Sequence, residues 1–224
     1  MKLKDLTEYK GKYPQERVQI FVDGSNLYHA LKSECGRVDL DYLKFAEMLT
    51  NGRKLIRLNL YVATFDPQRS PKEAREQQRF IDDVQKLPYI NVKHKMLNYK
   101  DGIPYEKGID ILIAVDMVTQ ALWNYYDTSI LVSGDGDFAP VLSKIKNSGK
   151  QVENVSFDSR RSKSLIESSD LFIELTPEDL RDCFKNGYPP NKSIPIIEIP
   201  AKQSPAGKIN TANLFSGGAY QEIR

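Results

Sequence analysis

The sequence predicts an α/β domain of three layers, with a mostly parallel central sheet and helices on both of its faces. Short apolar runs rich in β-branched residues alternate along the chain with longer helix-like stretches, as repeated β-α-β units require. At 224 residues, of which 40% are hydrophobic, the chain is also long enough to bury the core of one such domain.

Three apolar runs in the first half of the domain predict strands. They cover residues 17–22, 55–63 and 89–96. In the third run, apolar residues and His94 alternate with Asn and Lys. We therefore expect one face of this strand to be buried and the other to be solvated.

Helix-like patterning fills the intervals that follow these strands. The expected helices cover residues 26–32, 39–49 and 71–87. Asp39 is the expected N-cap of the second helix, and Gly52 is its expected stop. Ser70 and Pro71 begin the third helix, because proline suits the first helical position.

An apolar run at 109–122, after a polar loop at 100–107, opens the second half of the domain. The run is too long for an ordinary strand, so we expect a buried helix whose end is closed by Trp123, Tyr125 and Tyr126. The remaining expected elements are strands at 129–132, 151–157 and 171–175, helices at 138–146 and 162–167, and a short helix from Thr176.

Composition divides the chain into three parts. Residues 1–16 form a charged leader, residues 17–185 form the domain, and residues 186–224 form a tail in which prolines interrupt short apolar pieces. We expect the tail to be extended or disordered on its own. Docking of the tail on a partner or on its own domain stays open, as does a homo-oligomer.

Composition also excludes several classes of protein. The net charge of +2 does not indicate a globally basic nucleic-acid binder. The charged N-terminus lacks the apolar core of a secretory signal, and no run reaches the roughly 18 apolar residues of a membrane helix. Two distant cysteines and two histidines argue against a His/Cys zinc site. A reducing, cytoplasmic location is therefore expected, with no membrane contact.

Acidic residues follow two of the predicted strands. Asp135 and Asp137 come directly after the strand at 129–132, Asp23 ends the first strand, and Asp110 lies in the first turn of the apolar helix. Because ligands bind at the carboxyl edge of such sheets, we expect the four carboxylates to converge there. Like charges at close range need a cation between them, and a hard divalent metal suits carboxylate oxygens.

A metal held by these acids suits the hydrolysis of phosphodiester bonds. Mg²⁺ or Mn²⁺ would acidify a water, hold the scissile phosphate and offset charge on the leaving oxygen. Ser25 and Asn26 lie just beyond Asp23, where the start of a helix favours phosphate. Singly, each acid could instead be a turn residue or an N-cap. Asp116 lies roughly 120° around its helix from Asp110, so we expect it to play a supporting or structural role.

Three segments of the chain together resemble the NYN domain family, in its LabA-like branch. They are residues 20–26, residues 107–110 with Asp116, and residues 130–138. The resemblance covers residues 17–175 and implies a PIN-like nuclease fold with a metal-dependent ribonuclease site. Carried over by position, it implies that the catalytic residues and metal ligands are Asp23, Asp110, Asp135 and Asp137, with Asn26 as a polar helper.

RNA, expected to be single-stranded, is the predicted partner. Lysines and tyrosines interleave before the acid-bearing helix, at Lys93, Lys95, Tyr99, Lys100, Tyr105 and Lys107. Cations with aromatic side chains near a metal suit single-stranded nucleic acid, although singly such residues are more often solvated or packed. Lys107 is the residue expected to contact a phosphate.

The leading hypothesis is therefore a metal-dependent ribonuclease that acts in RNA processing or regulation. A catalytically weak RNA-binding scaffold is the first alternative, although a pure binder has no reason to gather acids where phosphates bind. A phosphatase that uses Asp135 and Asp137 is the second. Such enzymes usually carry a threonine two residues after the second acid, where this chain has Ala139.

Overall fold

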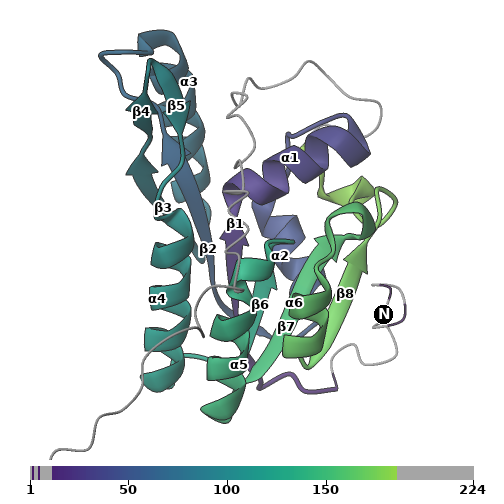
Figure 1. Cartoon of the computed structure of the whole chain (residues 1–224). Helices are drawn as coiled ribbons and strands as arrows, with labels where there is room; N and C mark the ends of the chain where they lie inside the picture. The colour runs from purple at the N-terminus through teal and green to yellow at the C-terminus, as the bar shows by residue number, and fades with distance from the viewer. Residues whose placement is uncertain (1, 3–4, 6–11, 186–224) are drawn as a thin grey trace, which may run out of the picture.

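The computed structural model describes residue 2, residue 5 and residues 12–185. The predicted tail at 186–224 and most of the predicted leader lie outside these residues. Strands and helices alternate around a central sheet (Figure 1), which confirms the predicted α/β class. Within the described ranges, no helix has the length and apolar character needed to cross a membrane.

Six strands form the central sheet in the order β3-β2-β1-β6-β7-β8, and neighbours pair in parallel. Their bounds are β1 Arg17–Asp23, β2 Lys54–Thr64, β3 Ile90–Met96, β6 Thr128–Val132, β7 Gln151–Phe157 and β8 Leu171–Leu175. The chain builds outward from β1 to β3, returns to β6 beside β1, and then builds outward to β8. The strand order therefore reverses between β1 and β6, and ligands bind at the carboxyl side of such a switch point.

Helices cover both faces of the sheet. One face carries α1 (Gly24–Cys35), α2 (Tyr42–Thr50) and α3 (Pro71–Gln85), and the other carries α4 (Ile109–Leu122), α5 (Ala139–Asn147) and α6 (Lys163–Ser168). Three short 3-10 helices lie at Gly136–Phe138, Asp158–Arg160 and Arg181–Cys183. A short helix was predicted from Thr176, but residues 177–180 form a turn and the 3-10 helix begins only at Arg181.

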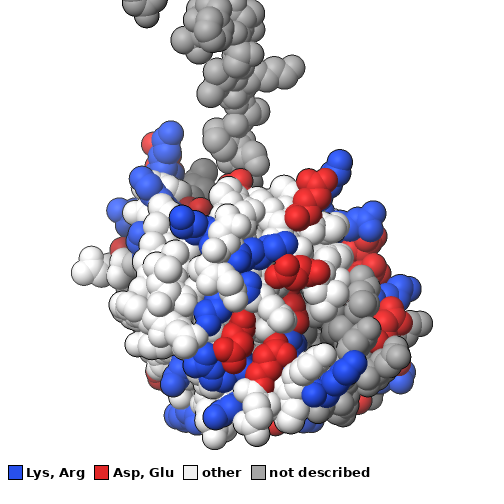
Figure 2. Space-filling model, turned by 90° about the horizontal axis from the view of Figure 1, so that it is seen from below, with Lys and Arg blue, Asp and Glu red and all other residues white. Residues whose placement is uncertain are grey.

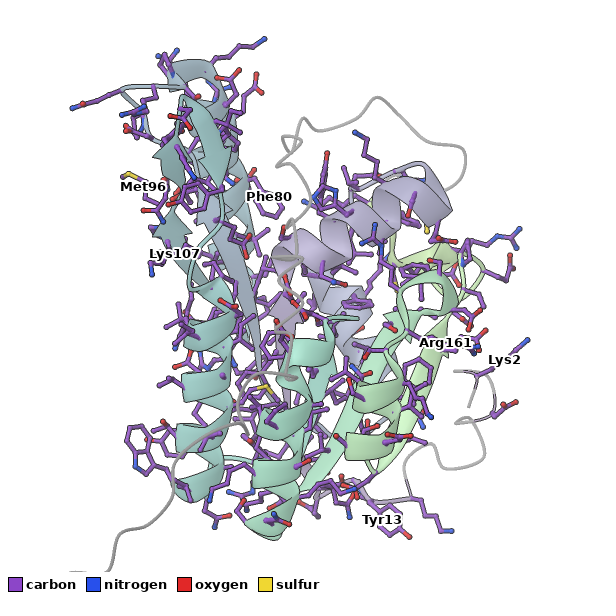
Figure 3. All side chains as sticks on the ribbon, viewed as in Figure 1. Lys2, Tyr13, Phe80, Met96, Lys107 and Arg161 are labelled. Carbon is purple, nitrogen blue, oxygen red and sulfur yellow. The ribbon has the colours of Figure 1, made fainter. Side chains whose placement is uncertain are left out.

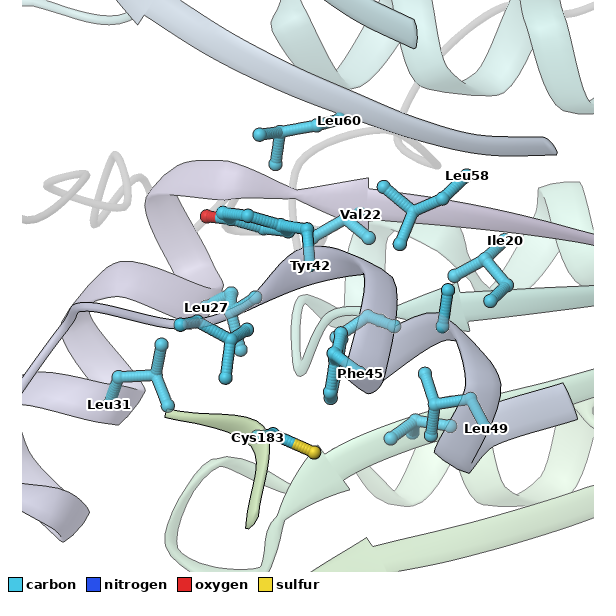
Figure 4. Close-up of a cluster of buried hydrophobic side chains, with 14 of the residues drawn as sticks. Ile20, Val22, Leu27, Leu31, Tyr42, Phe45, Leu49, Leu58, Leu60 and Cys183 are labelled. Carbon is cyan, nitrogen blue, oxygen red and sulfur yellow. The ribbon is translucent and has the colours of Figure 1, made fainter. Parts of the chain in front are cut away.

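The side chains of β1 contribute to two hydrophobic cores, one on each face of the sheet. Successive side chains of a strand point to opposite faces. Val18, Ile20 and Val22 therefore enter the core under α1, α2 and α3, whereas Phe21 enters the core under α4 and α5. All four side chains are completely buried, and Figure 4 shows the first core with Phe45 of α2 packed toward the sheet.

The amino edge of the sheet carries paired charges. Figure 2 shows this edge from below, with cations and acids intermixed. Arg17 pairs with Asp127 at 2.6 Å, and Arg53 contacts Glu16 at 3.3 Å and Glu153 at 2.6 Å. Because these charges neutralise one another locally, the described residues of this edge do not present the one-sided positive potential that attracts nucleic acid.

The N-terminus of α2 differs from the prediction. Its N-cap is Asp41, whose Oδ1 accepts from the backbone N–H groups of Leu43 and Lys44 at 3.1 and 3.2 Å. Asp39, the predicted cap, forms a buried ion pair with Arg37 at 2.5 Å. Two acids within three residues offer alternative caps, and the one with a close cation is used for the ion pair.

A β-hairpin replaces part of the predicted polar loop at 100–107. Strands β4 (Asn98–Lys100) and β5 (Ile103–Tyr105) pair in antiparallel fashion, and the turn between them is Asp101-Gly102. Both turn residues have positive φ, 50° and 79°, which is the conformation that Asp-Gly favours in two-residue hairpins. The hairpin stands beyond the end of β3, above the central sheet (Figure 1).

Two predicted burial patterns are also corrected. On β3, His94 and Met96 are exposed, and Lys93 is half-buried because α4 covers its face of the sheet. On α4, Ile111 and Leu122 are 66% and 68% exposed, so the helix is buried on one side only.

The three aromatic residues after α4 differ in burial. Trp123 and Tyr125 are exposed, with ring centroids 5.5 Å apart. Tyr126 is buried and donates to the Met117 carbonyl at 2.7 Å. Only the last of the three predicted residues therefore closes the end of the helix.

Candidate functional site

The end of β1 places Asp23 at the switch point. Asp23 is the last residue of the strand and is buried, yet it also caps α1, because its Oδ1 accepts from Asn26 N–H at 3.0 Å. The next residue must be glycine, since a Cβ at Gly24 would lie 2.4 Å from the Tyr61 carbonyl oxygen on β2. The tight turn holds this carboxylate at the carboxyl edge of the sheet.

The end of β6 is joined directly to the end of β1. Ser133 Oγ donates to Asp23 Oδ2 at 3.2 Å and accepts from Asp135 N–H at 3.1 Å. Gly134 N–H donates to Asn26 Oδ1 at 3.1 Å. These bonds bring the first two predicted acids, Asp23 and Asp135, into one hydrogen-bonded network through a buried serine.

The turn after β6 positions the second pair of acids. Asp135 is half-buried, and its Oδ1 accepts from Asp137 N–H at 3.0 Å, so it caps the 3-10 helix Gly136–Phe138. Asp137 itself is exposed. The capping role and the predicted metal role are compatible, because a carboxylate has a second oxygen and further lone pairs.

The loop after β7 is brought against this turn. A Cβ at Gly134 would lie 2.0 Å from the Arg160 carbonyl oxygen, so the two backbones touch. Arg160 therefore belongs to the same edge of the sheet, and sequence reasoning missed it. The signal was available, because Arg160 follows a parallel strand and the carboxyl ends of all such strands meet at one edge.

Replacing Gly134 by Ala is expected to lower the free energy of unfolding by about 2 kcal/mol, because a backbone must move to admit the methyl group. Gly136→Ala is the matched control. There the added Cβ would meet the Ser162 and Ser164 hydroxyls at 2.7 and 2.9 Å, and flexible side chains can turn away. Chemical denaturation of both variants checks this, and equal costs would contradict the packing argument.

The start of α4 supplies the fourth acid. Asp110 is half-buried in the first turn of the helix, which follows Gly108 with φ of 82°. Lys95 Nζ would lie 2.7 Å from a Cβ at Gly108, so this lysine lies against the turn. Lys107 is exposed immediately before it, where the hairpin leads into α4 (Figure 3).

Asp116 has a structural role. Its Oδ2 accepts from Lys93 Nζ at 2.5 Å and from the Tyr61 hydroxyl at 2.6 Å, which ties α4 to β3 and β2. Burial, followed by the Asp116 carboxylate, raises the pKa of Tyr61, so that its hydroxyl remains a donor. Lys93, predicted to face RNA, is therefore engaged by Asp116.

The donor set fits a divalent ion by chemical type. The four acids offer the hard oxygen ligands that Mg²⁺ and Mn²⁺ prefer, and Ser133 already links the Asp23 carboxylate to the backbone N–H of Asp135. Among the residues that the structure describes, however, no three His, Cys, Asp or Glu side chains lie close enough together to hold one ion. Direct ligation by Asp110 and Asp137 thus goes beyond the contacts seen here.

Comparisons with known proteins place the fold and the site in context. The family model for the NYN domain matches residues 17–176. The low amplitude and bright protein LabA of Synechococcus elongatus is 27% identical over 189 residues, which span 81% of this chain and 95% of that protein. A crystal structure of a protein of unknown function from Vibrio parahaemolyticus is 26% identical, with a TM-score of 0.59 over 74% of this chain and 96% of that one.

Proposed function

We propose that this chain, which belongs to the NYN domain family in its LabA-like branch, is a metal-dependent ribonuclease. Membership places it in a family with a PIN-like nuclease fold. The observation that carries the proposal is that Ser133 links the Asp23 carboxylate to the backbone N–H of Asp135, at the point where the strand order reverses. Both residues bring a carboxylate to the edge where ligands bind, and a divalent cation there would offset the negative charge of the two acids.

The four acids Asp23, Asp110, Asp135 and Asp137 would hold the ion. A bound Mg²⁺ or Mn²⁺ supplies the Lewis acidity that lowers the pKa of water and offsets charge on a phosphate. Asp23 and Asp135 are pre-positioned by their backbone and serine hydrogen bonds, which limits the reorganisation needed for binding.

Polar residues around the acids would bind the RNA backbone. Asn26 Oδ1 is engaged by Gly134 N–H, which orients the side-chain amide. No described residue accepts from Asn26 Nδ2, so this group can donate to a phosphate oxygen. Ser25 lies beside it at the start of α1, where the helix dipole favours anions. Lys107 and Lys95 add positive charge at the start of α4.

A second function has one observation in its favour. Because three acids are not gathered around a point among the described residues, an RNA-binding scaffold with weak catalysis fits this arrangement too. A scaffold would keep the contacts of Asn26, Ser25 and the lysines without turnover. The two functions differ in whether phosphodiester bonds are broken, which a direct assay measures.

The test uses the full-length protein and an end-labelled single-stranded RNA of mixed sequence, with Mn²⁺, with Mg²⁺ or with EDTA. Single-stranded DNA of the same sequence and a small phosphomonoester are run in parallel. We expect RNA cleavage that requires a divalent metal and little phosphate release from the monoester. Binding without cleavage would instead support the scaffold, and phosphate release without RNA cleavage would support the phosphatase.

A further inference from the structure

The side of α4 that faces away from the sheet carries an apolar stripe. Figure 1 shows α4 at the flank of the fold, and its other side packs against β1, β2 and α5. The stripe consists of residues spaced by four, three and four positions, namely Ile111, Val115, Val118 and Leu122. At 3.6 residues per turn, these four lie within about 60° of one another around the helix. Ile111, Val115 and Leu122 are 66%, 55% and 68% exposed, so most of the stripe is open to solvent.

The stripe belongs to a large uncharged surface. Asp110 and Asp116 are the charged residues of α4, and neither is part of the stripe, since Asp116 faces the sheet and pairs with Lys93. Beyond the end of the helix, Trp123 and Tyr125 add side chains that are 62% and 50% exposed. The exposed parts of the stripe and of these two aromatic side chains together present on the order of 600 Å². That area matches the largest apolar patches of monomeric proteins, and such patches mark interaction surfaces.

The spacing of the stripe makes it complementary to a reversed copy of itself. When two identical helices pair in antiparallel fashion about a two-fold axis, the residue numbers of every contacting pair add up to the same value. The numbers 111 and 122 add up to the same value as 115 and 118. Ile111 of one copy would therefore meet Leu122 of the other at both ends of the pair, and Val115 would meet Val118 beside the axis. Alternating steps of three and four residues are also the spacing of the contact seam between paired helices.

A groove beside the stripe can receive a side chain of the second copy. The groove lies between α4 and α5 and has a volume of about 280 Å³. Its lining includes the stripe residues Val118 and Leu122, together with Ala121 and Ile145. Because Ile111 of the second copy would meet Leu122, its side chain would enter this groove and leave water. The groove and the symmetric spacing thus both favour a second copy of this chain as the occupant of the stripe.

We propose that two copies of this chain associate through α4, as an antiparallel pair of helices related by a two-fold axis. Two copies would together cover on the order of 1,200 Å², which is the lower end of the range for specific interfaces. Because one partner satisfies the whole stripe, association stops at a dimer. The two first turns of α4, each with its Asp110, would lie at opposite ends of the pair, about 20 Å apart along it. The inference requires neither a metal nor RNA, so it goes beyond the proposed function.

The test is sedimentation velocity of the full-length protein in EDTA, without RNA. We expect a reversible equilibrium between monomer and dimer, with a Kd on the order of 10 μM, across a protein concentration of about 1 to 100 μM. Val115→Glu places two carboxylates beside the two-fold axis and should weaken the dimer at least about 10-fold. Ile166→Glu is the matched control, because Ile166 is an exposed isoleucine on another helix, α6, and its replacement should leave the dimer unchanged.

A complementary pair of variants tests the antiparallel register. Ile111→Lys and Leu122→Glu should each weaken self-association, because each places a charge against an apolar side chain at both ends of the pair. When the two variants are mixed, a heterodimer should form. At one end of it the introduced ammonium faces the introduced carboxylate, and at the other end the native contact between Leu122 and Ile111 remains. The melting temperature of each variant is recorded, so that loss of association is not confused with loss of folding.

Several outcomes would overturn the inference. They are a wild type that stays monomeric at every concentration, an equal loss of association in Ile166→Glu and Val115→Glu, growth into species larger than a dimer, and mixed variants that do not associate. A synthetic peptide of residues 190–200 is titrated as well. Its binding to a monomeric wild type, but not to Val115→Glu, would assign the stripe to the chain's own C-terminal segment. RNA cleavage by a strictly monomeric protein would contradict the dimer and leave the ribonuclease standing, whereas a dimer without cleavage would do the reverse.

Discussion

Replacing Asp135 by Asn is expected to reduce metal-dependent RNA cleavage on the order of 100-fold or more, with little change in the fold. The substitution removes one negative charge from the proposed metal site and nearly preserves shape. The amide oxygen of Asn can still accept from Asp137 N–H, so the cap of the 3-10 helix survives. Without a metal, loss of one carboxylate should even relieve repulsion with Asp23.

The matched control for this prediction is Asp158→Asn. Asp158 follows β7 at the same edge of the sheet, is exposed, and pairs with Arg161 at 2.7 Å. Its removal should leave cleavage within about 2-fold of wild type, since exposed ion pairs contribute little. Initial rates with saturating Mn²⁺ give the comparison. Full activity in Asp135→Asn, or an equal loss in Asp158→Asn, would contradict a site-specific role for Asp135.

Asp39→Asn is expected to lower the free energy of unfolding by about 3 kcal/mol at neutral pH. The Arg37 and Asp39 side chains are 3% and 9% exposed, so the substitution removes the negative charge that pairs with a buried guanidinium at 2.5 Å. Arg37 also stacks on the Phe184 ring at 4.3 Å, which keeps it in the interior. Equilibrium unfolding in guanidinium chloride measures the loss. Asp158→Asn, in an exposed pair, should cost less than about 1 kcal/mol.

The difference in the free energy of unfolding between wild type and Asp39→Asn should depend on pH. The hydrogen bond from Arg37 holds the pKa of Asp39 below its ordinary value. A depressed pKa stabilises the folded state above the unfolded pKa of about 3.9, and this contribution is lost as the pH falls through the folded-state pKa. The difference between wild type and Asp39→Asn should therefore be constant near pH 7 and shrink below about pH 4. A difference that grows on acidification would contradict this account.

Much of the fold could be predicted because its signals are local. The apolar run at 109–122 and the strands at 151–157 and 171–175 match the observed α4, β7 and β8 in both bounds. Which side of a helix is buried depends on the elements that pack against it, and the local sequence does not specify that packing. Apolar residues dominate α4 apart from Asp110, Asp116, Thr119 and Gln120, so its composition could not reveal that Ile111 and Leu122 face solvent.

The candidate site could be predicted in part. Rules for parallel sheets placed Asp23 and Asp135 at one edge, and the structure joins them through Ser133. The pairing of Lys93 with Asp116 depends on how α4 lies across β3, which no spacing within the chain specifies. Ligation by Asp110 and Asp137 stays a prediction, and so does binding of RNA.

Binding of Mn²⁺ to the full-length protein tests the central claim most directly. Electron paramagnetic resonance distinguishes free from bound Mn²⁺, and the titration is repeated for Asp23→Asn, Asp135→Asn and Asp158→Asn. We expect wild type and Asp158→Asn to bind the ion equally, and each of the other two variants to bind it at least about 10-fold more weakly. Equal affinity in all four proteins, or no binding by wild type, would contradict a metal site at the ends of β1 and β6.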